Sequence, residues 1–272
     1  MQQDMQQDMQ QDMQQQPDVV EVPERREIAA FLEALDSTPP DAVTACRGWT
    51  THEIIAHLAS GADAFANQIE AHLAGRPVPE FGAWQVRETP YRAMDDSALR
   101  RRVEASEHRM SEAFAAMLAD DPDARDDAVG WGLPVAELVK HMRQEYAVHR
   151  WDLIGDDQTG MDLLGQQDLL VHSVQLLGDS LLRVGLARDP EPGEPLTARL
   201  RCSGEPDLVL SVQDGAGTLT LDGPVDAPDV IETDPAARLV MLWGRRPADA
   251  RRVRSTLAPE RLARLQTLLS GY

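Results

Sequence analysis

The sequence has little of several residue types that would mark a class of protein. Only two cysteines, Cys46 and Cys202, occur among 272 residues, and they form neither a CxxC pair nor a disulfide framework. We interpret both as ordinary thiols, because the sequence around Cys46 supplies no base that would make it a catalytic nucleophile. No stretch of about 18 apolar residues occurs, and the N-terminus lacks the pattern of a signal peptide. We therefore expect a cytoplasmic protein.

Positive charge is also scarce. There are 26 lysine and arginine residues against 46 aspartate and glutamate residues, which gives a net charge of −20 and a pI of about 4.6. Such a chain repels nucleic acid and anionic membranes, so we expect neither as a partner. An acidic small-molecule substrate would need a local basic pocket. Aromatic residues make up only 4%, so the core must be built mainly from Leu, Val, Ile and Ala.

The first part of the chain is organised as a tail followed by helices. Residues 1–16 repeat Met-Gln-Gln-Asp with a period of four, which predicts a disordered low-complexity tail over residues 1–18. Apolar residues then recur at helical spacing. The expected helices cover residues 22–36, 50–74, 97–118 and 134–154, and a loop rich in Pro and Gly covers 76–90. Four helices with short to medium loops predict a helical bundle, which we place at residues 19–160.

The second part of the chain changes character. A connecting helix is expected over residues 163–184, followed by a boundary rich in proline at 188–195. Beyond it, apolar residues alternate with a period of two. The pattern predicts strands at 196–202, 208–212 and 218–221, and helices at 235–243 and 259–269. Residues 161–272 are therefore expected to hold the connecting helix and a small α+β domain.

Three residues on two of the bundle helices could hold a metal ion. Glu145 and His149 are four residues apart, so they share one face of the fourth helix. His57 flanks the apolar stripe of the second helix. Two histidines and one carboxylate form a ligand set that leaves a coordination position open for water or substrate. Each feature alone is more common as an ordinary helix pair or a core histidine, so the set needs support from its context.

Short motifs supply that context. Cys46–Thr50 followed by His57-Leu58-Ala59 resembles the "GWT…HLA" segment of the DinB-like superfamily. Glu145–Leu153 resembles the "E…HRWDL" segment of its actinobacterial branch, which includes mycothiol-dependent maleylpyruvate isomerase. Leu242–Arg246 is similar to the "LWGR" segment of the C-terminal domain that accompanies this bundle. The resemblance covers about residues 24–270, with the three segments in the expected order.

The resemblance implies a fold, cofactors and site residues. It implies a DinB-like bundle whose metal ligands are His57, Glu145 and His149, followed by a sterol-carrier-like α+β domain. It also implies a divalent metal ion, most naturally zinc, and mycothiol as the thiol cofactor. In this family an arginine of the second domain is thought to hold the substrate, and the matching positions are Arg245 or Arg246. The implied enzyme adds a metal-activated thiolate to a small electrophile, which gives isomerisation or thiol transfer.

Two other functions fit the same residues. A metal-dependent hydrolase would use the open position for a water of lowered pKa and would need no thiol. A non-catalytic metal- and ligand-binding protein would have a closed site, with His141 or Asp152 as a fourth ligand. Addition of mycothiol separates the first of these from a thiol-dependent enzyme.

Overall fold

The computed structural model describes residues 26–269 apart from four short gaps. These gaps are residues 126–132, 177, 179–181 and 223–228. The tail expected over residues 1–18 lies outside the described residues.

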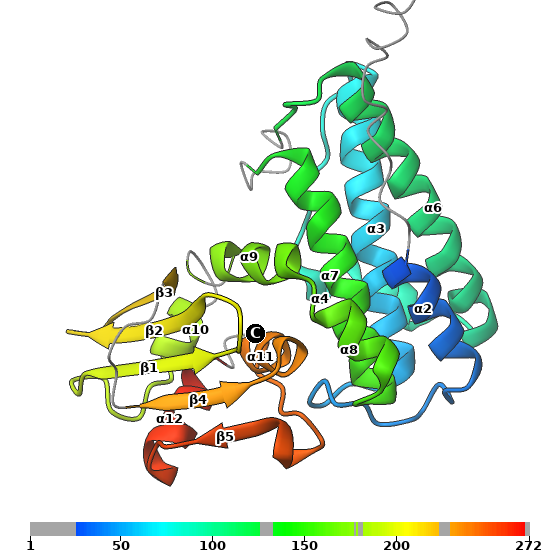
Figure 1. Ribbon diagram of the computed structural model, residues 1–272. Coiled ribbons are helices and arrows are strands. Elements are labelled where there is room, and N and C mark those ends of the chain that lie inside the picture. The colour runs from blue at the N-terminus through cyan, green and yellow to red at the C-terminus, as the bar shows by residue number, and fades with distance from the viewer. Residues whose placement is uncertain (1–25, 126–132, 177, 179–181, 223–228, 270–272) are drawn as a thin grey trace, which may run out of the picture.

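Four long helices form the first part of the molecule. They are α2 (Arg26–Asp36), α3 (Thr51–Leu73), α6 (Asp96–Asp120) and α7 (Val135–Ile154). Helix α3 packs along α6, and α2 packs along α7 (Figure 1). Their apolar faces share one core, in which Phe31, Ile54 and Leu138 are fully buried. The expected helical bundle is therefore confirmed.

Local signals in the sequence set the ends of these helices. The carboxylate of Asp95 accepts hydrogen bonds from the backbone N–H groups of Ser97 and Ala98 and so caps α6. Helix α7 starts after Pro134 and ends at Gly155, whose φ of 80° favours glycine. The end of α7 is therefore fixed just beyond the stretch that carries Glu145 and His149.

Two short helices lie where the sequence predicts only a loop. They are α4 (Trp84–Arg87) and α5 (Thr89–Arg92). The loop expected over 76–90 was wrong at its C-terminal end, because four residues are too few to show a helical period. Pro90 lies in the first turn of α5, where its missing N–H costs nothing. Glu88 joins the two helices and is completely buried.

The single connecting helix expected over 163–184 was also wrong. The described residues form three helices instead: α8 (Gln158–Leu164), α9 (Gln167–Leu176) and α10 (Leu182–Leu186). Gly165 ends α8, and the chain restarts as α9 two residues later. The apolar period runs across this break because Leu163 and Leu170, seven residues apart, are buried in the same core. Hydrophobic spacing alone therefore concealed the turn.

A five-stranded sheet follows. Its strands are β1 (Leu196–Arg201), β2 (Asp207–Gln213), β3 (Ala216–Asp222), β4 (Val230–Thr233) and β5 (Val253–Ser255), in the order β3-β2-β1-β4-β5. The three strands expected from sequence are confirmed. Strands β4 and β5 were missed, since four and three residues show little alternation. Only the β1–β4 pair is parallel among the described pairings.

Helices connect the sheet to the bundle. The segment after β4 forms α11 (Pro235–Leu242), and α12 (Pro259–Leu268) follows β5. Figure 1 shows α9 and α11 between the sheet and the bundle. One hydrophobic core runs from the sheet through α11 to Val148 and Trp151 on α7. The second part of the chain is thus packed against the helix that carries two of the metal-ligand candidates. None of the described helices is long and apolar enough to cross a membrane.

Candidate metal centre

A capping box holds the first turn of α3 in place. The Thr50 side chain accepts from the backbone N–H of Glu53, and the Glu53 carboxylate accepts from the backbone N–H of Thr50 at 2.8 Å. His57 follows one turn later on the same helix, with 23% of its side chain exposed. The "GWT" motif therefore has a structural role, because its threonine fixes the start of the helix that carries His57.

Helix α7 brings Glu145 and His149 to the same place. The Nε2 atom of His57 lies 3.2 Å from Oε2 of Glu145, and Nε2 of His149 lies 3.6 Å from that same oxygen. The three donor atoms all lie within 4.8 Å of one another. The structure therefore brings together the three residues that the sequence singled out, although His57 and Glu145 are 88 positions apart in the chain.

A carboxylate holds the far ring nitrogen of each histidine. Nδ1 of His57 lies 2.7 Å from Oε1 of Glu88, and Nδ1 of His149 lies 2.9 Å from Oδ2 of Asp152. The side chains of Glu88 and Asp152 are both fully buried. Such a pair places the proton on Nδ1 and leaves the Nε2 lone pair for a metal ion. Both imidazoles therefore point their free nitrogen at Glu145.

Two arginines hold these carboxylates in turn. Arg92 donates to Oε2 of Glu88 through Nε and NH2 at 3.1 and 2.8 Å. Arg245 donates to Asp152 through Nε at 3.0 Å and NH2 at 2.7 Å. Burial of Asp152 raises the pKa of its carboxyl group. The interactions with Arg245 and His149 outweigh this effect, so the pKa is lowered overall. Glu145 has no arginine partner of this kind among the described residues, so its charge is available to a cation.

The electrostatics of the site favour positive charge at the centre. Burial lowers the pKa of His149, but the hydrogen bond to Asp152 and the nearby carboxylate of Glu145 outweigh it and raise the pKa to about 9. Burial raises the pKa of Glu145, but the nearby imidazole of His149 and the hydrogen bond to His57 hold it well below its usual range. The side chains therefore attract a cation at their meeting point, and a proton on His149 is the competitor of a metal ion.

Aromatic rings cover one side of the centre. The ring of Trp49 stacks on His149 at an interplanar angle of 9° and a centroid distance of 6.2 Å. It also meets the edge of His57 at 5.1 Å, and Trp84 packs against it at 5.7 Å. Trp84 is 42% exposed. The metal-ligand candidates thus lie behind a tryptophan pair that reaches the surface.

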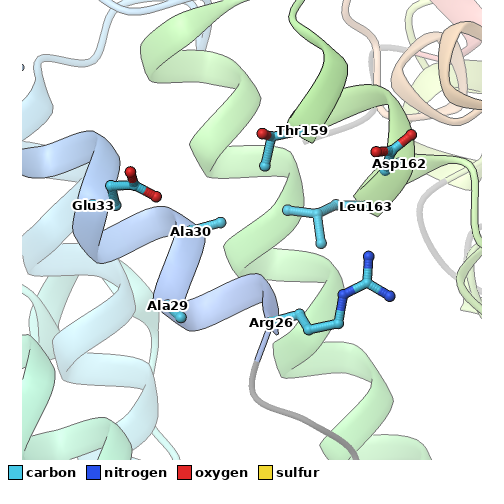
Figure 2. A pocket seen from close by; sticks show the side chains of 7 residues that line it. All are labelled: Arg26, Ala29, Ala30, Glu33, Thr159, Asp162 and Leu163. Carbon is cyan, nitrogen blue, oxygen red and sulfur yellow. The ribbon is translucent and has the colours of Figure 1, made fainter.

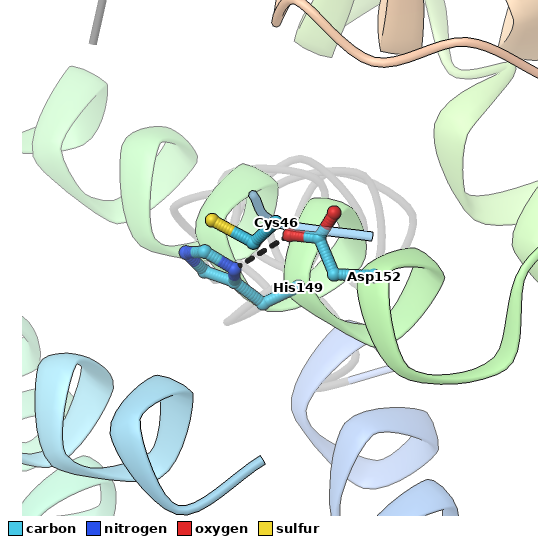
Figure 3. A group of neighbouring side chains, drawn as sticks. All are labelled: Cys46, His149 and Asp152. Carbon is cyan, nitrogen blue, oxygen red and sulfur yellow. Dashed lines mark hydrogen bonds and ion pairs between the residues drawn. The ribbon is translucent and has the colours of Figure 1, made fainter. Parts of the chain in front are cut away.

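Cys46 lies beside the same histidine, which the sequence did not predict. Its sulfur and donor atoms of His149 and Asp152 all lie within 4.8 Å of one another (Figure 3). The loop is held there because the backbone N–H of Ala45 donates to the carbonyl of Asp152 at 2.9 Å. Burial raises the pKa of the Cys46 thiol to about 11, so it stays protonated at neutral pH. Asp152 already serves His149 and Arg245, which disfavours a second metal site here.

The two arginines expected to meet the substrate have different surroundings. Arg245 is 7% exposed in its side chain and is held by Asp152, and its NH1 also donates to the carbonyl of Trp243 at 2.7 Å. Arg246 is exposed and bonds to Gln266. The nearby Asp249 pairs with Arg251. Arg245 thus touches a carboxylate that contacts a metal-ligand candidate, whereas Arg246 does not.

The remaining histidines lie outside the group. His172 bonds to Glu137 at 3.0 Å, and its Nε2 lies 3.4 Å from Nδ1 of His141. Neither His141 nor Asp152 belongs to the group of donor atoms around Glu145 among the described residues, so neither supplies the fourth ligand of a closed site there. His52 bonds to Asp96 and to the carbonyl of Arg92.

A surface pocket between α2 and α8 is a separate feature. It is lined by Arg26, Ala29, Ala30, Glu33, Thr159, Asp162 and Leu163 (Figure 2). It contains no histidine or cysteine and shares no residue with the candidate metal centre.

Comparison with known proteins agrees with this geometry. Residues 22–154 match the family model described as the mycothiol maleylpyruvate isomerase N-terminal domain. The bundle is thus similar to this family. The matched region contains all three metal-ligand candidates, together with Glu88 and Asp152. No curated protein matches the chain.

Two solved structures resemble the whole arrangement. One is a crystal structure of the mycothiol-dependent maleylpyruvate isomerase, 19% identical, with a TM-score of 0.61 over 87% of this chain and 92% of that one. The other is a histidine-to-alanine mutant of such an isomerase, 17% identical, with the same TM-score and coverage. Both likenesses show the fold, and they extend beyond the bundle into the α+β part. The sterol-carrier likeness of that part stays a prediction.

Proposed function

We propose that this chain is a metal- and mycothiol-dependent cytoplasmic enzyme of the maleylpyruvate isomerase type. The metal ligands would be His57, Glu145 and His149. The metal would be a divalent ion, with zinc as the first candidate. The observation that carries the proposal is the convergence of three donor atoms from two helices, with each histidine oriented by a buried carboxylate. The family match of the bundle and the likeness to the isomerase support the thiol.

The donor set fits a tetrahedral metal ion. Zinc lies about 2.0–2.1 Å from nitrogen and oxygen ligands, which places neighbouring ligands of a tetrahedron roughly 3.3 Å apart. The two distances from Glu145 Oε2, 3.2 and 3.6 Å, are close to that spacing. Nitrogen and carboxylate donors without a buried thiolate suit zinc and similar dications. Three protein ligands leave one position open.

A divalent metal ion held by His57, Glu145 and His149 would supply the deprotonation of a bound thiol. The proposed reaction adds the thiol sulfur to a conjugated carbon–carbon double bond. Rotation about the resulting single bond and loss of the thiol give isomerisation, whereas release of the adduct gives thiol transfer. The protonated state of Cys46 supports an external thiol, because the chain's own cysteine is a poor nucleophile at neutral pH.

The side chains around the centre have orienting roles in this proposal. Glu88 and Asp152 hold the Nδ1 protons of the two histidines, and Trp49 shields one face of His149 from water. Arg245 fixes Asp152 from the second part of the chain. A direct contact between substrate and Arg245 or Arg246 stays a prediction.

Metal analysis and a thiol-dependent assay test the proposal. We expect about one divalent ion per purified chain, and conversion of maleylpyruvate only when mycothiol is added. Turnover of ester or amide substrates without thiol would favour the hydrolase. A metal-free chain, or a metal-loaded chain inert with mycothiol and several electrophiles, would count against the proposal.

Glu88 offers a second test through metal affinity alone. Glu88→Gln removes the charge that holds the Nδ1 proton of His57, and loss of such a partner lowers metal affinity about 10- to 100-fold. The measurement is zinc competition against a chromophoric chelator. Glu53→Gln is the matched control, because Glu53 also bonds Arg92 but does not touch His57. Equal affinities in the two variants would show that Glu88 has no role in orienting His57.

A further inference from the structure

Three arginines lie close to the candidate metal centre, and one of them differs from the others. Arg92 pairs with Glu53 and Glu88, and Arg245 pairs with Asp152. Arg87, at the C-terminal end of α4, has no ion pair with a carboxylate among the described residues. It is therefore the guanidinium at this site that retains its capacity to bind an anion.

Arg87 is held against α3 next to His57. Its Nε donates to Oγ of Ser60 at 3.3 Å, and that hydroxyl donates to the carbonyl of His57 at 3.0 Å. Its Cζ lies 4.4 Å from the ring centroid of Phe81, a cation–π contact that fixes the plane of the guanidinium. The group is thus positioned by uncharged partners, one helical turn from a metal-ligand candidate.

The outer nitrogens of Arg87 are open to a ligand. NH1 makes one long contact, 3.5 Å to the carbonyl of Gly82, and NH2 has no hydrogen-bond partner among the described residues. A Cβ on Gly61 would lie 3.9 Å from NH2, so this nitrogen lies beside α3 near Gly61. Burial lowers the pKa of Arg87, while the charges of Glu88 and Glu145 raise it, so the side chain is partly desolvated and near both carboxylates.

We propose that Arg87 binds the carboxylate of the electrophilic substrate. This inference rests on the proposed function and specifies its substrate class as a small anionic acid. A half-buried guanidinium with unused donors gains a charge-assisted, bidentate partner when a carboxylate arrives. It also supplies the local positive charge that an acid needs to approach a chain of net charge −20.

Binding of maleate, a small dicarboxylate probe, tests this assignment without turnover. We expect Arg87→Gln to weaken maleate binding to the zinc-loaded protein roughly 10- to 100-fold, the loss of a charge-assisted hydrogen bond. The maleate affinity of Arg87→Lys should lie between those of wild type and Arg87→Gln. Lysine keeps the positive charge but lacks the planar guanidinium that binds a carboxylate through two hydrogen bonds. Titration calorimetry gives the dissociation constants, and zinc competition confirms that metal affinity is unchanged.

Arg76→Gln is the matched control. It makes the same charge change just beyond the far end of α3, roughly 24 Å along the helix from His57 at 1.5 Å per residue. Maleate binding should match wild type in this variant. The proposal is overturned if wild type does not bind maleate, or if Arg87→Gln binds it as tightly as Arg76→Gln does.

The anion site and the proposed function fail in different ways. If maleate binding depends on Arg87 but mycothiol supports no reaction, the proposed function is wrong and the anion site stands. If the thiol-dependent reaction occurs, Arg87→Gln should raise the KM for maleylpyruvate and leave the KM for mycothiol near its wild-type value. An equal rise in both values would assign Arg87 to general site structure and overturn its role toward the substrate.

Discussion

Replacing His149 with alanine is expected to abolish stoichiometric metal binding. The substitution leaves Glu145 and His57 as the remaining members of the group, and two ligands bind a divalent ion far more weakly than three. After dialysis against metal-free buffer, the metal-to-protein ratio should fall from about one to near zero. Elemental analysis of the dialysed protein makes this measurement directly.

A matched histidine variant makes this result specific. His52 is on the same helix as His57, but it bonds to Asp96 and to the carbonyl of Arg92 and lies outside the metal group. His52→Ala should keep full metal content. His149→Gln, which preserves more of the packing against Trp49, guards against simple unfolding of the alanine variant. Full metal in both His149 variants would show that the ligands were chosen wrongly.

The sequence could group the three metal-ligand candidates because local signals, each weak alone, were combined with the motif resemblance. Glu145 and His149 share a helix face by spacing alone, and Thr50 marks the start of the helix that carries His57. The motif resemblance then related two helices that no local rule could bring together. The structure places these three side chains together, while metal binding itself stays a proposal.

The residues that support the ligands could not be predicted in the same way. Glu88 and Arg87 lie in two four-residue helices inside a stretch expected to be a loop, so neither had a face or a direction from sequence. Asp152 was visible three residues after His149, yet its spacing fitted a fourth ligand as well as an orienting partner. Only the tertiary structure shows that Arg245 donates a hydrogen bond to the Oδ1 atom of Asp152.

Tertiary contacts that the sequence does not show also explain why the connecting segment and the edge of the sheet were predicted incorrectly. Leu163 and Leu170 are seven residues apart, which is helical spacing across the turn at Gly165, so the hydrophobic period cannot separate two helices that face one core. Strands β4 and β5 are formed through pairing with β1 and with each other, a tertiary contact that four or three residues do not encode alone. Fold class was therefore more predictable than element boundaries.

Asp152 joins the metal centre to the second part of the chain. Its two oxygens accept from Nδ1 of His149 and from Arg245, and both the aspartate and the arginine are almost completely buried. In Asp152→Asn the amide presents one acceptor and one donor group, so one of the two partners must face an N–H. The substitution also leaves the buried guanidinium of Arg245 without its counter-charge.

We expect Asp152→Asn to change both stability and metal affinity. Breaking a buried pair costs about 3–5 kcal/mol, and loss of the carboxylate on a ligating histidine lowers affinity about 10- to 100-fold. Denaturant unfolding and chelator competition measure the two effects. Asp156→Asn is the control, because Asp156 also links α7 to the second part of the chain through Arg252 and the backbone of Asp249 without touching His149.

A double variant separates the two roles of Asp152. Asp152→Asn combined with Arg245→Met removes the uncompensated charge, so most of the lost stability should return. Metal affinity should stay low, since the carboxylate on His149 Nδ1 is still missing. If affinity recovers together with stability, Asp152 serves only to neutralise Arg245. If the single variant keeps wild-type affinity while Asp156→Asn loses it, the orienting role belongs to the contact between the two parts of the chain and not to Asp152.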